Sequence, residues 1–182
     1  VAALVLSLWL VTNERAQGPA ISASAAALVL AAAWSFAVAG FGRESLIAEL
    51  LLAGSNLGWL WMLYRLFGHD DRDKSLGPIR PVIAALAFVE MMQFALITAR
   101  LQYDPQPDAQ LLILQFSYTF RLLLCVGTLV LIHNLYVGAS QQARLSLRWP
   151  AAALGAIFLY DLNFYTIAYL ANSLPVLLAD LR

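Results

Sequence analysis

The apolar stretch "AALGAIFLYDLNFYTIAYL" contains a single carboxylate, Asp161, close to its centre. Two further ionisable residues are placed in the same way, Glu90 in "LAFVEMMQFAL" and Arg121 in "FSYTFRLLLCV". A charge at the centre of a membrane helix costs about 2.5–3.5 kcal/mol, whereas each Leu, Ile or Phe contributes only about −0.3 to −0.6 kcal/mol. Each of these charges is therefore expected to face the interior of a helical bundle and to have a partner there.

The depths of the three residues in their stretches are similar, which predicts a cluster of Glu90, Arg121 and Asp161. Gln93 lies three residues after Glu90 and Tyr118 three residues before Arg121, so each shares a helix face with its charge. Two carboxylates would then compete for one deep cation, and such a cluster is a candidate for responding to protons, cations or a ligand. The alternative is a static ion-pair network that fixes the helix positions. Weaker polar candidates are Glu49, Asn56, His133, Asn134 and Asn163.

The elements that would position these residues are transmembrane helices. Hydrophobic residues make up 62% of the 182 residues and charged residues 12%, against about 45–50% and about 25% in soluble domains. A membrane helix needs about 20 apolar residues, because its backbone amides must be hydrogen-bonded within the segment. The sequence thus predicts an all-α, polytopic transmembrane helical bundle that forms one domain over residues 1–182. Its six expected spans, the first cut short, are Val1–Thr12, Ala20–Ala39, Ser45–Phe67, Pro81–Ala99, Leu111–Tyr136 and Trp149–Ala171.

Basic residues concentrate in alternate connections between these spans, and positive charge in short loops stays in the cytoplasm. The first, third and fifth connections with their flanks are the richer ones and hold Arg15, Arg65, Arg72, Lys74, Arg80, Arg144 and Arg148. These connections are therefore expected to be cytoplasmic, and both ends of the segment are expected on the outer side. A seventh helix beyond Arg182 would be needed to reach a cytoplasmic domain.

Small residues recur at a spacing of four in two spans, which allows close approach of helix backbones. Gly54 and Gly58 form a GxxxG pattern in "GSNLG", and Ala151 and Gly155 form a second such pair. Packing within the chain and a homodimer face are the two interpretations.

Several other classes of function find no support in the sequence. The net charge is zero, so no basic excess favours a nucleic-acid partner. The lone Cys125 lies in an apolar run and is interpreted as a small buried hydrophobe, and the acidic stretch "GHDDRDK" as a solvated turn rather than a metal site. No HExxH, GxSxG, Walker or Rossmann pattern is present, so neither a catalytic site nor a cofactor is predicted in this segment.

The last third of the chain carries a family resemblance. The run "RLLLCVGTLVLIHNLY", a short arginine-bearing loop and then "LGAIFLYDLNFYTIAYL" resemble the N-terminal membrane region of PrsK-type sensor histidine kinases. These kinases accompany the exosortase and PEP-CTERM exopolysaccharide systems of Gram-negative bacteria. Arg121 and Tyr160–Asp161 fit the family, whereas His133 stands where an acidic residue is frequent and Val137 where a basic one is frequent.

The resemblance implies a multi-pass sensory domain of the bacterial inner membrane. It further implies a seventh helix, a GAF-like domain and a histidine-kinase core beyond Arg182, a homodimer formed through the full-length kinase, and a response regulator as partner of the missing domains. The output would be regulation of exopolysaccharide and protein-sorting genes. A small transporter or channel with a midplane proton or ion site is the main rival, since buried membrane charges also mark transport pathways. A membrane-embedded enzyme is the third interpretation.

Overall fold

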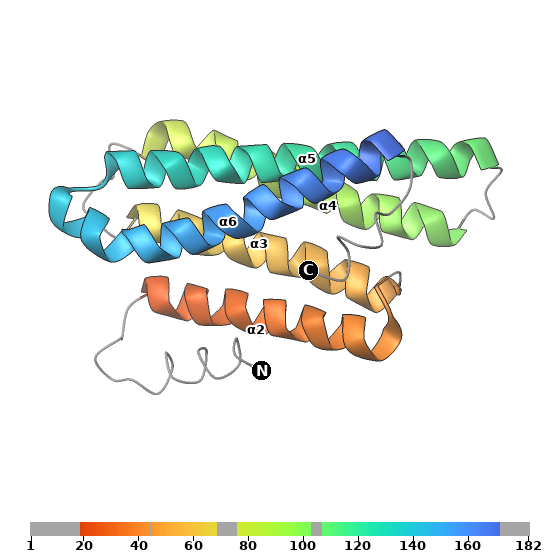
Figure 1. Cartoon of the computed structure of the whole chain (residues 1–182), viewed down its shortest axis with the longest axis horizontal. Coiled ribbons are helices and arrows are strands. Elements are labelled where there is room, and N and C mark those ends of the chain that lie inside the picture. The colour runs from red at the N-terminus through yellow and green to blue at the C-terminus, as the bar shows by residue number, and fades with distance from the viewer. Residues whose placement is uncertain (1–18, 44, 69–75, 103–106, 172–182) are drawn as a thin grey trace. The chain divides into compact units, whose positions relative to one another are not determined.

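A computed structural model describes residues 19–43, 45–68, 76–102 and 107–171 (Figure 1). In this part of the chain the fold is all-α, and each of its five helices contains a window long and apolar enough to cross a membrane. The sequence predicted six spans, but the first of them, Val1–Thr12, lies outside the described residues. The helices are α2 (Pro19–Phe41), α3 (Leu46–Gly68), α4 (Leu76–Gln102), α5 (Pro107–Gly138) and α6 (Gln141–Ala171).

Helices α2 and α3 begin and end within two residues of the predicted spans, whereas α4, α5 and α6 begin earlier than predicted. The largest difference is at α6, which begins at Gln141 rather than Trp149. The stretch "VGASQQARLSLR" was expected to connect two spans because it is polar and contains a turn-forming residue. It is mostly helical, because Gln, Ala, Leu and Arg are strong helix formers and a helix continues into water beyond the bilayer. Pro150 lies inside α6 without ending it.

The turn between α2 and α3 is built by two residues with specific backbone roles. Gly42 has a φ of 85°, in the left-handed region that glycine adopts readily, and its amide donates to the carbonyl of Val38. Ser45 precedes α3 and its hydroxyl accepts a hydrogen bond from the amide of Ala48 at 3.2 Å. Ser45 is therefore the N-cap of α3 and fixes where that helix starts.

The chain divides into two compact units, residues 1–97 and 98–182, with the boundary near the end of α4. In the first unit, α2 and α3 lie side by side (Figure 1). Their buried side chains include an unusual number of alanines: Ala23, Ala25, Ala27, Ala32, Ala37, Ala48 and Ala53. Side chains of this size let two helix backbones approach closely, while only 22% of the membrane-length window of α2 is buried.

In the second unit, α5 packs against α6, and a short turn at Ala139 and Ser140 joins the two helices (Figure 1). Arg144, in the first turn of α6, donates from Nε to the carbonyl of Ala139 at 2.9 Å and from its terminal nitrogen to that of Val137 at 2.6 Å. These carbonyls lie at and just beyond the C-terminal end of α5, where a positive charge is favourable. Arg144 thus caps α5 and ties the two helices together.

Most of the surface of the spans is apolar and exposed. Only 22% to 44% of the residues in each membrane-length window are buried within the chain. The exposed side chains include many large hydrophobic ones, among them Phe36, Phe88, Phe116, Leu123, Leu159 and Leu170. A soluble protein rarely exposes so much contiguous apolar surface, and a lipid environment accounts for it. The chain is a multi-pass, transmembrane-type helical protein.

Candidate functional site

Helices α5 and α6 pack against each other, and a set of regularly spaced buried residues on the two helices is here called the α5–α6 seam. Its buried residues recur at alternating intervals of three and four, which is the spacing of a coiled-coil interface. The centre of the seam is polar, because it includes both Arg121 and Asp161. The residues on α5 are Tyr118, Arg121, Cys125, Thr128 and Ile132, and those on α6 are Leu154, Phe158, Asp161, Tyr165 and Ala168.

The register of the seam follows from contacts at two heights. Near its middle, Arg121 contacts Tyr165, and near the connecting turn Tyr136 and Arg148 line the same groove. In two antiparallel helices joined by a short turn, each step forward along one helix faces a step backward along the other. The numbers of two facing residues therefore add up to a nearly constant sum. This register places Asp161 opposite the turn of α5 that contains Cys125. The offset from Arg121 along the seam is about 5 Å, roughly one helical turn.

Arg121 lies against an aromatic wall. Its terminal nitrogen donates to the hydroxyl of Tyr165 at 3.5 Å, and its guanidinium carbon lies 5.4 Å from the centroid of the same ring. The ring of Tyr118 approaches that of Tyr165, with 6.3 Å between centroids. A cation over an aromatic face is stabilised by up to about 2 kcal/mol when water is excluded, and only 7% of Arg121 is exposed. The two tyrosines thus give the charge a polar lining from both helices.

Asp161 is as deeply buried as Arg121, with 7% of its surface exposed. A buried carboxylate is tolerated only where opposite charges or hydrogen-bond donors compensate for lost water. Asp161 lies one turn before Tyr165 on the same face of α6, so it shares the seam with Arg121. The seam also contains Thr128, whose fully buried hydroxyl oxygen has no hydrogen-bond partner within the described residues.

A second polar pair lies in the first unit, between α3 and α4. The side-chain amide of Asn56 donates to Oε1 of Glu90 at 3.1 Å, and both residues are buried. The buried face of α4 is a narrow stripe whose two central residues are polar, and its members are Leu86, Glu90, Gln93 and Ile97. The Asn56–Glu90 hydrogen bond therefore fixes which face of α4 is turned toward α3.

The sequence predictions for these residues have different outcomes. All five predicted residues, Glu90, Gln93, Tyr118, Arg121 and Asp161, are buried. Tyr118 and Arg121 both lie against Tyr165, and Asp161 is buried one turn before Tyr165 on the same helix, whereas Glu90 and Gln93 belong to the other unit. A single cluster of Glu90 with Arg121 and Asp161 stays a prediction.

Two partners were not singled out from the sequence. Tyr165 could have been found, because it lies four residues after Asp161 and so shares its helix face. Asn56 was considered only a weaker candidate, because nothing in its own helix indicates that Glu90 lies opposite.

The predictions for the small residues also have different outcomes. A Cβ atom at Gly58 would lie 3.3 Å from the Cα of Ala27, so the backbones of α2 and α3 are in close contact there. At Gly54 and Gly155 a Cβ atom would meet no atom within 4 Å in the described chain. Within the described chain the GxxxG pattern is thus a close contact at its second glycine only, and Ala151 lines an open groove, so a homodimer face for Ala151 and Gly155 stays a prediction.

The described residues contain no group of three or more His, Cys, Asp and Glu side chains that could hold a metal ion. The stretch "GHDDRDK" at residues 68–74 falls almost wholly outside the described part of the chain. No family model matches this sequence, and neither a curated protein nor a solved structure matches it. The chemistry of the site therefore rests on its own geometry, which is a charged and aromatic seam with no metal-ligating cluster among the described residues.

Proposed function

We propose that the chain is the membrane-embedded sensory input domain of a two-component sensor histidine kinase of the PrsK type. The observation that carries this proposal is a coincidence of two independent features. The resemblance to that family is strongest from Arg121 to Leu170, and the same residues form the seam that buries Arg121 and Asp161. The part of the chain that resembles a sensor thus also contains two buried charges of opposite sign.

The proposed signal is a change in the packing of the α5–α6 hairpin. Buried charges make a seam sensitive to protonation or to an approaching ion, because adding or removing one charge leaves another without compensation. A shift of about 1 kcal/mol changes the ratio of two packing states about fivefold. Beyond Arg182, a seventh helix would carry this change to cytoplasmic kinase domains in a homodimer, and the kinase would phosphorylate a response regulator.

Autophosphorylation of the full-length protein in membrane vesicles tests the proposal directly. Radiolabelled phosphate from ATP should be incorporated on a histidine, and Asp161→Asn and Arg121→Leu should each change the signal-dependent rate about fivefold or more. Leu159→Ala is the matched control, because Leu159 lies on the same helix and is exposed on its apolar surface. This control should leave the rate unchanged.

Two results would count against the proposal in different ways. A full-length protein without autophosphorylation would reject the kinase assignment. If Asp161→Asn and Arg121→Leu both keep normal expression and normal signal-dependent autophosphorylation, the seam only holds the helices together and the sensing element lies elsewhere.

A transporter is the second candidate, and the burial of Glu90, Arg121 and Asp161 within membrane-length helices favours it. No internal repeat or paired broken helix in the sequence accompanies these charges, and many transporters have such features. Proton or solute flux into proteoliposomes that disappears in Asp161→Asn would decide for transport.

A further inference from the structure

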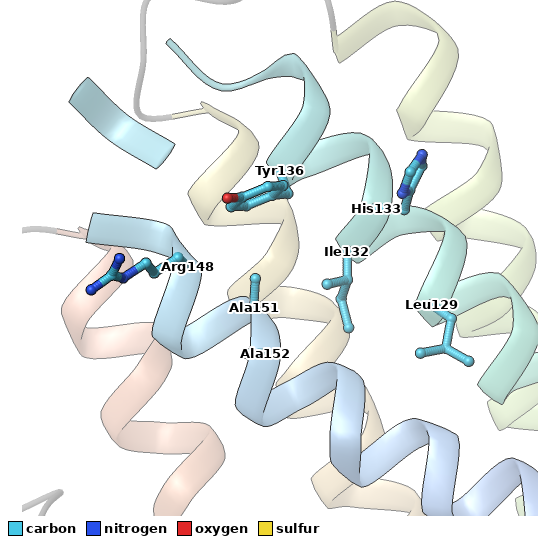
Figure 2. Close-up of a pocket in the computed structure, with 7 residues that line it drawn as sticks. All are labelled: Leu129, Ile132, His133, Tyr136, Arg148, Ala151 and Ala152. Carbon is cyan, nitrogen blue, oxygen red and sulfur yellow. The ribbon is translucent and has the colours of Figure 1, made fainter. Parts of the chain in front are cut away.

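An open groove lies between α5 and α6 beside the turn that joins them (Figure 2). Its volume is about 420 Å³, within the range of about 300–1,000 Å³ typical of pockets for small molecules. The groove belongs entirely to the second unit and is separate from the buried seam residues Arg121 and Asp161. Its lining residues are Leu129, Ile132, His133 and Tyr136 from α5, and Arg148, Ala151 and Ala152 from α6.

The lining changes from polar to apolar along the groove. Tyr136 and Arg148 lie at the end nearest the turn, and Leu129 lies at the opposite end (Figure 2). Seven residues separate Leu129 from Tyr136, which corresponds to about 10 Å along the helix. A phospholipid has the same order of chemistry over a similar length, with a phosphate followed by apolar chains.

This gradient agrees with the direction in which the helices cross a membrane. The membrane-length windows run from Gln110 to Gly138 in α5 and from Leu147 to Ala171 in α6. Tyr136 and Arg148 therefore lie at the interface ends of both spans, whereas Leu129 lies well inside. Trp149, next to Arg148, is 70% exposed, as expected of an aromatic residue at headgroup level.

The two arginines near the turn have different roles. Arg144 is engaged in capping the carbonyls at the end of α5. Arg148 is exposed, and its guanidinium carbon lies 5.0 Å from the centroid of the Trp149 ring. The lining of the groove also contains His133 and no carboxylate. The polar end of the groove is therefore positively charged, and Arg148 has donors to offer to an anion.

We propose that this groove binds one anionic phospholipid of the leaflet next to the α5–α6 turn. The guanidinium of Arg148 and the hydroxyl of Tyr136 donate hydrogen bonds to the headgroup phosphate, since a planar guanidinium matches the geometry of phosphate oxygens. An acyl chain follows the apolar wall formed by Leu129, Ile132 and Ala152. A zwitterionic lipid such as phosphatidylcholine binds less well, because its ammonium group meets the positive charge of Arg144 and Arg148.

Native mass spectrometry of the delipidated full-length protein tests this proposal. Phosphatidylglycerol and phosphatidylcholine with identical acyl chains are added separately, and retention of one lipid is expected to favour phosphatidylglycerol about tenfold. Arg148→Gln is expected to abolish this preference, and Arg148→Lys to retain part of it because the charge remains. Ala152→Trp fills the apolar end and should weaken retention of both lipids.

Arg80→Gln is the matched control. Arg80 is also exposed, lies at the end of a span that the charge bias places on the same side of the membrane, and loses the same charge, but it lies on α4 outside the groove. The preference of the Arg80→Gln variant for phosphatidylglycerol over phosphatidylcholine should stay within about twofold of that of the unmodified protein. This change is far smaller than the tenfold effect expected at the groove.

Three results would overturn the proposal. Equal retention of the two lipids would exclude recognition of an anionic headgroup. An equal loss in Arg80→Gln and Arg148→Gln would mean that only general surface charge acts. Displacement of the lipid by glycerol 3-phosphate at similar concentration would identify a site for a free phosphate. None of these results depends on whether the protein is a kinase.

Discussion

The two helix pairs α2–α3 and α5–α6 are held together in different ways. The buried residues of α2 and α3 include many alanines, and Gly58 lies in close contact with Ala27. The α5–α6 seam includes larger side chains such as Tyr118, Phe158 and Tyr165, and it also contains the buried charges Arg121 and Asp161. In lipid the hydrophobic effect does not drive helices together, so both pairs depend on van der Waals contact or on polar interactions. One pair is specified mainly by shape and the other also by charge.

This difference predicts which substitutions each pair tolerates. The α2–α3 interface should be destabilised by added side-chain volume and unaffected by the loss of charges in other helices. A charged seam should be most sensitive to the loss of one partner, because the remaining charge stays buried without compensation. The four predictions that follow concern the purified protein in detergent, with stability measured by thermal or denaturant unfolding.

The largest effect is expected for Arg121→Leu. If Arg121 compensates Asp161 across the seam, its removal leaves a buried carboxylate and lowers the free energy of unfolding by about 3–5 kcal/mol. The double variant Arg121→Leu/Asp161→Leu should recover most of this loss, because no charge is left in the seam. A double variant that is less stable than Arg121→Leu would show that the two residues do not compensate each other.

Adding volume at Gly58 should disrupt the other pair. Gly58→Leu forces a side chain against the backbone of Ala27 and is expected to destabilise the protein by about 2–3 kcal/mol. Gly54→Leu is the control, since a Cβ there has open space, and it should lose less than about 1 kcal/mol. Similar losses at both glycines would contradict the close contact of α2 and α3 at Gly58.

An intermediate effect is expected between α3 and α4, where one hydrogen bond joins Asn56 to Glu90. Glu90→Leu removes the acceptor and leaves the amide of Asn56 buried, at a loss of about 1–3 kcal/mol in unfolding free energy. Glu90→Gln keeps an acceptor oxygen and should lose less. A double-mutant cycle with Asn56→Ala should give a coupling energy of about 0.6–1.7 kcal/mol, and zero coupling would exclude the bond as a stabilising contact.

The smallest effect is expected for Tyr165→Phe. The hydrogen bond from Arg121 to its hydroxyl is long, at 3.5 Å, so its loss should lower stability by under about 1 kcal/mol. The ring remains and so does the cation–π contact. Tyr165→Leu removes the ring and should have a clearly larger effect, and equal losses for the two variants would mean that the ring does not stabilise Arg121.

Much of the architecture could be predicted from the sequence, because bilayer thickness and backbone hydrogen bonding leave few choices for an apolar chain. The ends of α2 and α3 were predicted within two residues. The start of α6 was missed by eight residues, since the polar stretch from Gln141 to Arg148 is helical outside the apolar span. Hydropathy detects where a helix meets lipid and does not detect where a helix ends.

The candidate site was predicted in part for the same physical reason. Burial of Arg121 and Asp161 follows from the cost of exposing either charge to lipid, and that cost is read from their positions alone. The contacts of Arg121 with Tyr165 and of Glu90 with Asn56 depend on how each helix is rotated about its axis and on which helix lies beside it. A sequence of nearly uniform hydrophobicity contains little information on that rotation.

The sequence by itself determined that the chain forms apolar helices and that its midplane charges are buried, because transfer free energies depend on residue type and depth. Only the tertiary structure decided that Arg121 contacts Tyr165, that Glu90 accepts from Asn56 and that Gly58 rather than Gly54 is the close contact. The physical reason is that side-chain contacts have ranges of a few ångströms. They depend on helix rotation and register, which many sequences of the same hydropathy would leave open.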